Sequence, residues 1–116
     1  YGANNGTIYN NTIEGIHWGI YLNGTLSNSL SSNTIFTNGT SNNYGIYLIN
    51  SSFGNVDLNN IFTSGTLGLN YGVYLSTSSS MNNINSNNIS TGGTGGSNSG
   101  VYMSFSTSNN IKSAKE

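Results

Sequence analysis

The sequence is organised around a four-residue apolar unit that occurs four times, with successive copies 26, 27 and 28 residues apart. The copies are Gly19-Ile20-Tyr21-Leu22, Gly45-Ile46-Tyr47-Leu48, Gly72-Val73-Tyr74-Leu75 and Gly100-Val101-Tyr102-Met103. A short apolar unit that returns with a period in the twenties is typical of a solenoid, in which each repeat buries its apolar side only against its neighbours. The repeat therefore predicts a solenoid.

Two more aliphatic positions follow each of the first three units. The first lies eight residues after the end of the unit, or nine after Leu75, and the second lies five residues later; these pairs are Leu30 and Ile35, Val56 and Ile61, and Ile84 and Ile89. The pair Ile8 and Ile13 precedes the first unit with the same five-residue step, and Ile111 follows Met103 after eight residues. The segments are short, rich in β-branched and aromatic residues, and separated by Asn, Ser and Gly, which is typical of strands and turns. We therefore expect an all-β fold: a right-handed parallel β-helix with three short strands per coil and about four to five coils.

The spacings also predict where loops occur. The five-residue step between the two aliphatics is constant, so that corner is expected to be a tight turn. The step from the second aliphatic to the next glycine is 6 residues from Ile13, 10 from Ile35, and 11 from Ile61 and Ile89. We expect a protruding loop at this corner after the first coil. Insertions in solenoids gather on one face, which is often the binding face.

Polar residues recur at equivalent positions and predict two internal stacks. Asparagine always lies two residues before the second aliphatic, at Asn11, Asn33, Asn59 and Asn87. Stacked coils would align these amides in a ladder, each donating to one neighbour and accepting from the other, and Asn tolerates the left-handed geometry of a turn. A second stack is expected six residues after each glycine, at Thr25, Ser51, Ser78 and Ser106.

Aromatic residues supply the main candidate contact surface. Strand alternation points Ile20 and Leu22 inward and the tyrosine between them outward. An outward ladder is expected from Tyr21, Tyr47, Tyr74 and Tyr102, with Trp18, Tyr44 and Tyr71 near the same edge. It would either stabilise the sheet by cross-strand pairing or contact a glycan or a packing neighbour. Phe36 and Phe62 are also expected to face outward, beneath the loops that follow them.

The composition excludes several classes of function. Only 4% of the residues are charged and the net charge is −1, so no basic patch is present to bind nucleic acid. No apolar run is long enough for membrane insertion. Cysteine and proline are absent, so there is no disulfide framework, and nearly every strand residue can donate its backbone N–H.

The Gly-Ile-Tyr-Leu, Ser-Ser and Asn-x-Ile elements together resemble the parallel β-helix repeats of the pectin-lyase-like superfamily. They are especially similar to Asn-rich repeats of archaeal and bacterial surface proteins, which are grouped with a periplasmic copper-binding family, the accessory proteins of nitrous oxide reduction. The resemblance covers about residues 5 to 113. It implies right-handed coiling but no single activity, because these repeats serve lyases, hydrolases, epimerases, adhesins and surface layers.

No catalytic or metal-binding constellation is visible. Glu14 and Asp57 are the only acids before the C-terminus, and they occupy different strand positions of different coils, whereas hydrolases and lyases need clustered carboxylates. Copper would require imidazole or sulfur ligands, but His17, Met81 and Met103 fall at unrelated repeat positions. We therefore expect no cofactor and no metal, and do not transfer copper binding from the similar family.

The two ends of the sequence lack visible caps. Ile111 begins a fifth coil, Ala114 stands where the ladder asparagine would be, and Lys112, Lys115 and Glu116 bring three of the five charged residues together. An uncapped β-helix leaves unpaired backbone groups at its ends, which favours association. Residues 1–116 are thus expected to form one solenoid segment, either part of a longer solenoid or a stacking subunit.

These features favour a non-enzymatic structural or adhesive solenoid of an exported cell-surface or extracellular filament protein. The expected partners are other copies, end to end or side by side, and a glycan is possible; nucleic acid and membrane insertion are not expected. The alternative is a fragment of a carbohydrate-active β-helix enzyme whose catalytic coils lie outside these residues.

Overall fold

The computed structural model describes residues 2–112, and within them all regular secondary structure is β-strand. Ala114, Lys115 and Glu116, which figure in the predictions for the C-terminal end, lie outside the described residues. The strands are β1 (Thr7–Tyr9), β2 (Thr12–Gly15), β3 (Trp18–Asn23), β4 (Ser29–Ser31), β5 (Thr34–Gly39), β6 (Asn43–Ile49), β7 (Asn55–Asp57), β8 (Asn60–Gly65), β9 (Asn70–Ser76), β10 (Asn83–Asn85), β11 (Asn88–Gly93), β12 (Asn98–Ser104) and β13 (Asn110–Lys112).

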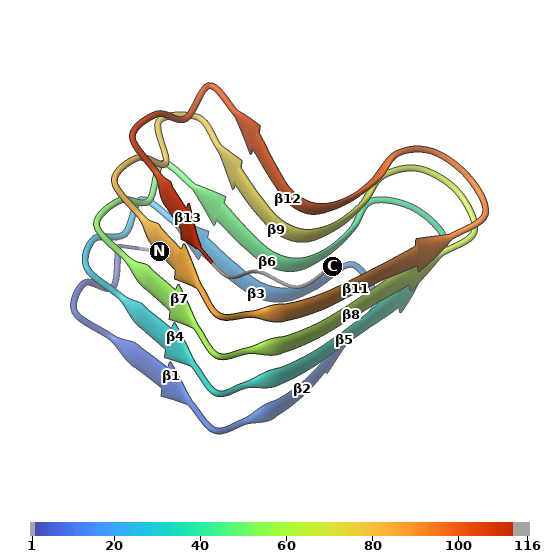
Figure 1. Ribbon diagram of the computed structural model, residues 1–116, viewed down its shortest axis with the longest axis horizontal. Helices are drawn as coiled ribbons and strands as arrows, with labels where there is room; N and C mark the ends of the chain where they lie inside the picture. The colour runs from blue at the N-terminus through green and yellow to red at the C-terminus, as the bar shows by residue number, and fades with distance from the viewer. Residues whose placement is uncertain (1, 113–116) are drawn as a thin grey trace.

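The strands form three parallel sheets that share one stacking direction (Figure 1). The first sheet has the order β1-β4-β7-β10-β13, the second β2-β5-β8-β11 and the third β3-β6-β9-β12. Each strand pairs with the equivalent strand of the next coil, so that Ile8 lies beside Leu30 and Ile35 beside Ile61. The prediction of a parallel β-helix with three short strands per coil is confirmed, with about four coils in the described residues.

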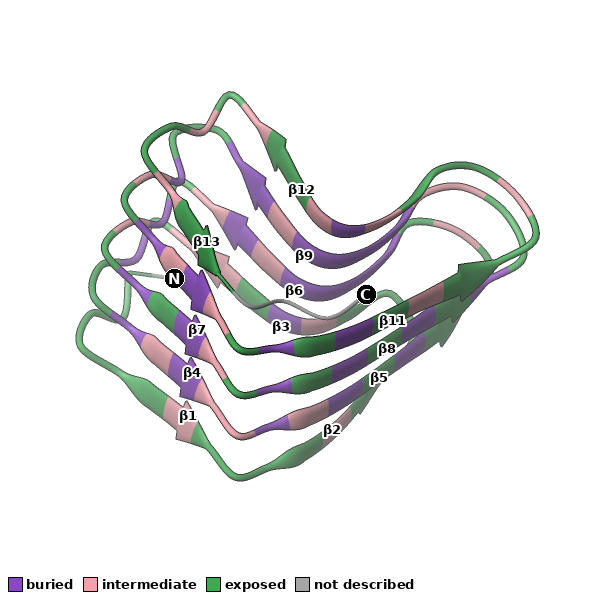
Figure 2. Ribbon diagram, in the orientation of Figure 1, coloured by how far each residue is buried: buried purple, intermediate pink, exposed green. Residues whose placement is uncertain are grey.

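The core is a set of aliphatic columns inside the coils. Strand β8 shows the pattern most clearly, because exposed and buried residues alternate along all six positions. Figure 2 shows the same buried positions repeating from coil to coil. The fully enclosed side chains come from the predicted aliphatic positions of all three sheets: Leu30, Val56 and Ile84; Ile35, Ile61 and Ile89; Ile46, Leu48, Val73 and Leu75.

The variable-length corner carries the loops, as predicted. The connections β5–β6, β8–β9 and β11–β12 project together from one side of the solenoid, whereas the chain passes from β2 to β3 through a short connection (Figure 1). The constant five-residue step is a tight corner between the first and second sheets, with only two residues between β1 and β2.

The tight corner differs from the prediction in one respect. The left-handed backbone belongs to the residue before each ladder asparagine: Asn10, Ser32, Leu58 and Ser86 have φ between 52° and 57°. The ladder asparagines themselves do not have positive φ. The preceding residue makes the turn, and this leaves the asparagine side chain free to point inward and form its hydrogen bonds.

Glycine in the repeated unit lies within a strand, at a bend in the third sheet. Strands β6 and β9 begin two residues before Gly45 and Gly72, and the sheet curves visibly along its length (Figure 1). A β-carbon on Gly45 would collide with the side chain of Ile61 and would lie 2.7 Å from the carbonyl oxygen of Gly72. Only glycine therefore permits the third sheet to approach the second closely at this point.

Candidate functional site

The predicted asparagine ladder is present and is continuous through four coils. Nδ2 of Asn11 donates to Oδ1 of Asn33 at 3.2 Å, and the next two links, to Asn59 and then to Asn87, measure 3.0 and 2.9 Å. Each acceptor oxygen also receives the backbone N–H of the preceding asparagine, at 2.9 to 3.0 Å. Asn33, Asn59 and Asn87 are buried, so the ladder satisfies the polar groups of a corner from which water is excluded.

A second asparagine ladder crosses the base of the loops. Asn43 donates to Asn70, and Asn70 donates to Asn98, each across 2.8 Å. The amides lie against Gly65, where any β-carbon would collide with Asn43. The ladder was not among our predictions, although its signal was in the sequence, because all three asparagines lie two residues before the glycine of the repeated unit.

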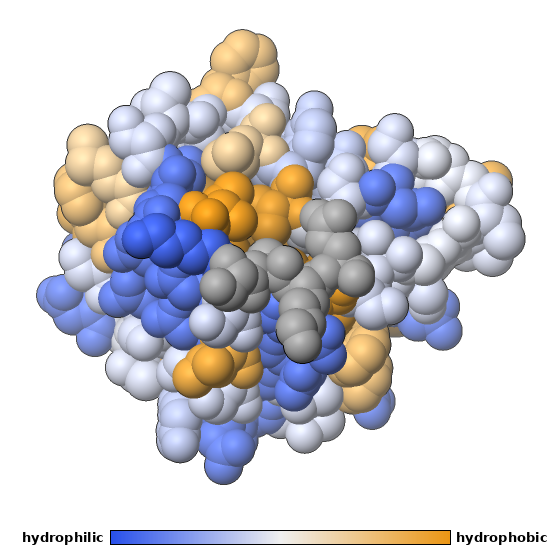
Figure 3. Space-filling model, viewed as in Figure 1, coloured by the Kyte–Doolittle hydropathy of each residue, from blue (hydrophilic) through white to orange (hydrophobic). Residues whose placement is uncertain are grey.

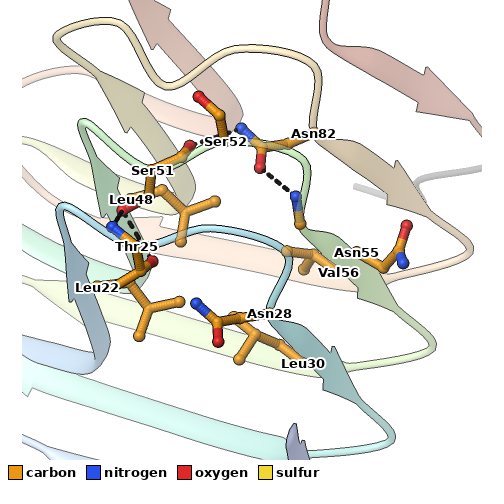
Figure 4. A pocket seen from close by; sticks show the side chains of 11 residues that line it. Leu22, Thr25, Asn28, Leu30, Leu48, Ser51, Ser52, Asn55, Val56 and Asn82 are labelled. Carbon is orange, nitrogen blue, oxygen red and sulfur yellow. Dashed lines mark hydrogen bonds between the residues drawn. The ribbon is translucent and has the colours of Figure 1, made fainter. Parts of the chain in front are cut away.

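A third column contains a gap. Asn28, Gly54, Asn82 and Asn109 occupy equivalent positions, and Nδ2 of Asn82 donates to Oδ1 of Asn109 at 3.2 Å. Gly54 has no side chain to continue the column toward Asn28. A cavity of about 10 Å³ lies beside it, lined by residues that include Thr25, Asn28 and Asn82 (Figure 4).

The hydroxyl stack forms with one different member. Oγ1 of Thr25 donates to Oγ of Ser51 at 3.0 Å, and that residue's backbone N–H donates to Oγ of Ser79 at 3.1 Å. The prediction of Ser78 was wrong: Ser78 is exposed and has φ of 62°. The extra residue of this coil is accommodated before Ser79, where Thr77 and Ser78 both have positive φ. Ser106 hydrogen-bonds locally to Ser104 O at 3.3 Å.

The predicted aromatic residues form one continuous cluster on the outside of the third sheet. We call this the tyrosine cluster, and its members are Trp18, Tyr21, Tyr44, Tyr47, Tyr71, Tyr74 and Tyr102. Neighbouring ring centroids are 4.5 to 5.8 Å apart. Tyr47 and Tyr74 stack with an interplanar angle of 2°, and Tyr44 meets Tyr47 edge to face. The bend at glycine brings these two columns of rings together.

Burial divides the tyrosine cluster into two groups. Tyr44 and Tyr71 are only 8% and 3% exposed, so their rings pack against neighbours and offer little surface to a partner. Burial, with a smaller contribution from neighbouring tyrosines, raises the pKa of Tyr44 to about 12 and raises the pKa of Tyr71. Trp18, Tyr21 and Tyr102 are exposed at the two ends of the cluster. Tyr44 and Tyr71 therefore serve to pack the cluster, whereas Trp18, Tyr21 and Tyr102 are accessible to a binding partner.

Phe36 and Phe62 stack on the outer side of the second sheet, with centroids 5.1 Å apart and an interplanar angle of 13°. They face outward as predicted. They are not covered by the loops, however, because the two residues remain 40% and 37% exposed. The loops extend away from the sheet, which leaves the rings open to solvent.

The structure brings no catalytic or metal-binding group together in the part of the chain it describes. Glu14 lies on β2 and Asp57 on β7, in different sheets and different coils. Residues 2–112 contain no group of three or more His, Cys, Asp or Glu side chains that could hold a metal ion. The described residues also contain no helix long and apolar enough to cross a membrane.

Comparison with known proteins identifies the family. Neither curated proteins nor solved structures gave a match to this chain. A family model described as periplasmic copper-binding protein (NosD) matches residues 1–115, nearly the whole sequence. This agrees with the parallel β-helix and with the resemblance drawn from the repeats. The chain therefore belongs to the NosD family, whose description as periplasmic accords with an exported protein.

Proposed function

We propose that this chain is a non-enzymatic structural or adhesive solenoid of an exported protein, at the cell surface or in an extracellular assembly. The observation that carries the proposal is the set of uninterrupted columns along the stacking axis. The aliphatic core, the asparagine ladders and the tyrosine cluster all extend from coil to coil. Such columns stiffen a rod and can be continued by any further coil of matching register.

The end strands support association with further coils. Within residues 2–112, strands β1, β2 and β3 each have a paired neighbour on one side only, as do β11, β12 and β13. Unpaired strand edges are templates for pairing with another chain or another segment. On the face that shows the last coil, apolar side chains reach the surface between hydrophilic patches (Figure 3). The low charge reduces repulsion between copies.

Copper binding, which the family description implies, does not fit the residues present. Copper in proteins requires imidazole, thiolate or thioether ligands gathered in one place. His17 precedes β3 in the first coil, Met81 precedes β10 and Met103 lies on β12. Nδ1 of His17 lies 3.1 Å from the carbonyl oxygen of Ser41, and the Met103 sulfur is 3.7 Å from an asparagine amide. We therefore assign no metal-dependent step to this chain.

Sedimentation velocity and electron microscopy of the purified chain test the proposal. Concentration-dependent assembly into rods or layers is expected. Ile13→Lys, which places a charge at the edge of the core on β2, should reduce assembly while circular dichroism shows that the fold remains. Ile16→Lys is the matched control, because Ile16 is exposed and lies outside the core. A chain that stays monomeric at millimolar concentration, or assembles equally well with both variants, would contradict a stacking role.

A further inference from the structure

A column of four residues on the outer side of the second sheet forms a surface separate from the tyrosine cluster. Glu14 pairs with Phe36, Phe36 with Phe62, and Phe62 with Ser90 in the parallel register. The two aromatic rings therefore stack between a carboxylate on one side and a hydroxyl on the other. Each phenylalanine has one face against its partner and the other face toward a smaller polar residue.

A hollow lies beside each phenylalanine. The first, of about 330 Å³, is lined by Glu14, Gly15, Ile16, Phe36 and Asn38. The second, of about 340 Å³, is lined by both phenylalanines and by polar residues that include Asn38, Ser64 and Ser90. Both hollows are open toward solvent rather than enclosed. The stacked rings and the two hollows form one elongated surface along the solenoid axis.

The chemical groups that line the two hollows indicate which class of ligand would bind there. Flat aromatic faces bind the apolar C–H faces of sugar rings, and amide, hydroxyl and carboxylate groups hydrogen-bond to sugar hydroxyls. Glu14 and Asn38 supply such groups in the first hollow, and Asn38, Ser64 and Ser90 supply them in the second. Neither hollow is lined by a cationic residue that would hold a phosphate or a sulfate.

We propose that this surface binds a neutral oligosaccharide, with sugar rings against the free faces of Phe36 and Phe62. The Glu14 carboxylate accepts hydrogen bonds from sugar hydroxyls and repels uronic acids. Because Phe36 and Asn38 line both hollows, the hollows adjoin, and an oligosaccharide longer than a disaccharide engages both. This site goes beyond the structural role and does not depend on self-association.

Calorimetric titration of the full chain with cellohexaose, maltohexaose and mannohexaose tests the proposal. At least one of them is expected to bind with a dissociation constant in the millimolar range or tighter. Phe36→Ala should weaken that binding at least tenfold. Phe53→Ala is the matched control, since Phe53 is an exposed phenylalanine on a different corner and should leave the affinity unchanged. Circular dichroism shows whether each variant remains folded.

Two further variants make the result decisive. Glu14→Gln should leave binding of the neutral sugar within about threefold and should permit tetragalacturonate, which the unmodified chain excludes, to bind. Tyr102→Ala, in the tyrosine cluster, should have no effect. The proposal is overturned if none of the three hexasaccharides binds at 10 mM, if tetragalacturonate binds the unmodified chain, or if Tyr102→Ala removes binding while Phe36→Ala does not. None of these outcomes depends on whether the chain assembles.

Discussion

The side-chain amide of Asn33 donates from Nδ2 to Oδ1 of Asn59 across 3.0 Å, and the same oxygen accepts the backbone N–H of Asn33 at 2.9 Å. Nδ2 of Asn59 in turn donates to the backbone oxygen of Leu30 at 2.9 Å. One side chain thus satisfies donors and acceptors on the neighbouring coil at a position with no solvent contact. The side chain therefore adds to the backbone hydrogen bonds that link the coils at this corner, such as the one from Asn60 N to Asn33 O at 2.8 Å.

Asn59→Ala is expected to destabilise the fold strongly. The substitution removes the acceptor of the buried Asn33 backbone N–H and one of the two acceptors of Asn33 Nδ2, which keeps its bond to Ile8 O, and it removes the side-chain donor to the Leu30 carbonyl. A buried polar group that loses its partner costs about 1–3 kcal/mol. We expect a loss of about 3 kcal/mol or more in the free energy of unfolding, measured by urea denaturation. Asn60→Ala is the matched control: Asn60 is exposed and accepts only a 3.3 Å bond from Asn88, so its loss should cost less than about 0.5 kcal/mol. Equal effects of the two substitutions would refute a special role for the buried ladder.

This ladder could be predicted from the sequence because its spacing is constant. The members of the hydroxyl stack could not all be predicted. The spacing reveals one inserted residue after Leu75, but it does not show which residue of Ser78-Ser79-Ser80 occupies the stack. The backbone shows that Thr77 and Ser78 take left-handed conformations, which returns Ser79 to the stack.

The burial of Tyr44 also could not be predicted from the sequence. Regular alternation along a strand would place it on the opposite side from Tyr47. The bend at Gly45 interrupts that alternation, and the two rings lie 5.2 Å apart on the same side. Phe36 shows the reverse case: its outward direction followed from alternation, but its exposure depended on where the loops point.

Gly54→Asn is expected to stabilise the chain by filling the gap in the third column. Gly54 does not have positive φ, so an asparagine can adopt its backbone conformation. Its amide would lie beside the water-sized cavity at this gap and restore a hydrogen-bonded link toward Asn28 worth about 1 kcal/mol. The new β-carbon would lie 3.1 Å from Oδ1 of Asn82 and 3.2 Å from the Asn28 carbonyl oxygen, so these neighbours must shift by a few tenths of an ångström. Thermal denaturation should show a higher Tm. Gly72→Asn is the control and should destabilise strongly, because a β-carbon there collides with Ile89. A lower Tm for Gly54→Asn would contradict this reading of the gap.

Leu58→Asn is expected to relieve backbone strain. Leu58 has φ of 57° and is 61% exposed. Its left-handed backbone therefore costs free energy, and burial of its side chain offsets little of that cost. Asparagine tolerates this region, and we expect a gain of about 1 kcal/mol in the free energy of unfolding. Leu67→Asn, at an exposed leucine without positive φ, should change stability little. If both variants lose stability to the same degree, Leu58 must make a contact that outweighs the strain.

Thr63→Val tests an unusual feature of the core. The hydroxyl of Thr63 is buried and has no hydrogen-bond partner among the described residues, and Thr37 in the neighbouring coil is in the same situation. Valine has nearly the same shape without a polar atom to desolvate, so we expect stabilisation of about 1 kcal/mol. Thr66→Val, at an exposed loop position, should be nearly neutral. Destabilisation by Thr63→Val in urea denaturation would mean that the hydroxyl is bound, for example to an internal water.

The buried tyrosines predict a loss of stability at alkaline pH. The pKa of Tyr44 rises from 10.0 to about 12 in the folded chain, chiefly because its ring is buried. Between pH 10 and pH 12, the Tyr44 hydroxyl therefore stays protonated in the folded state, whereas it is ionised in the unfolded state. The stabilisation is complete below pH 10 and declines, by about 1.4 kcal/mol per pH unit for one such group, as the pH rises toward 12.

Tyr44→Phe should remove this part of the pH dependence, because phenylalanine fills the same space without an ionisable group. The measurement is Tm between pH 8 and 12 for the unmodified chain, for Tyr44→Phe and for Tyr9→Phe. Tyr9 is exposed on β1 outside the tyrosine cluster, so its replacement should leave the slope unchanged. An identical alkaline decline in all three proteins would show that Tyr44 ionises as freely in the folded chain as in the unfolded one. That result would contradict the close packing from which its raised pKa follows.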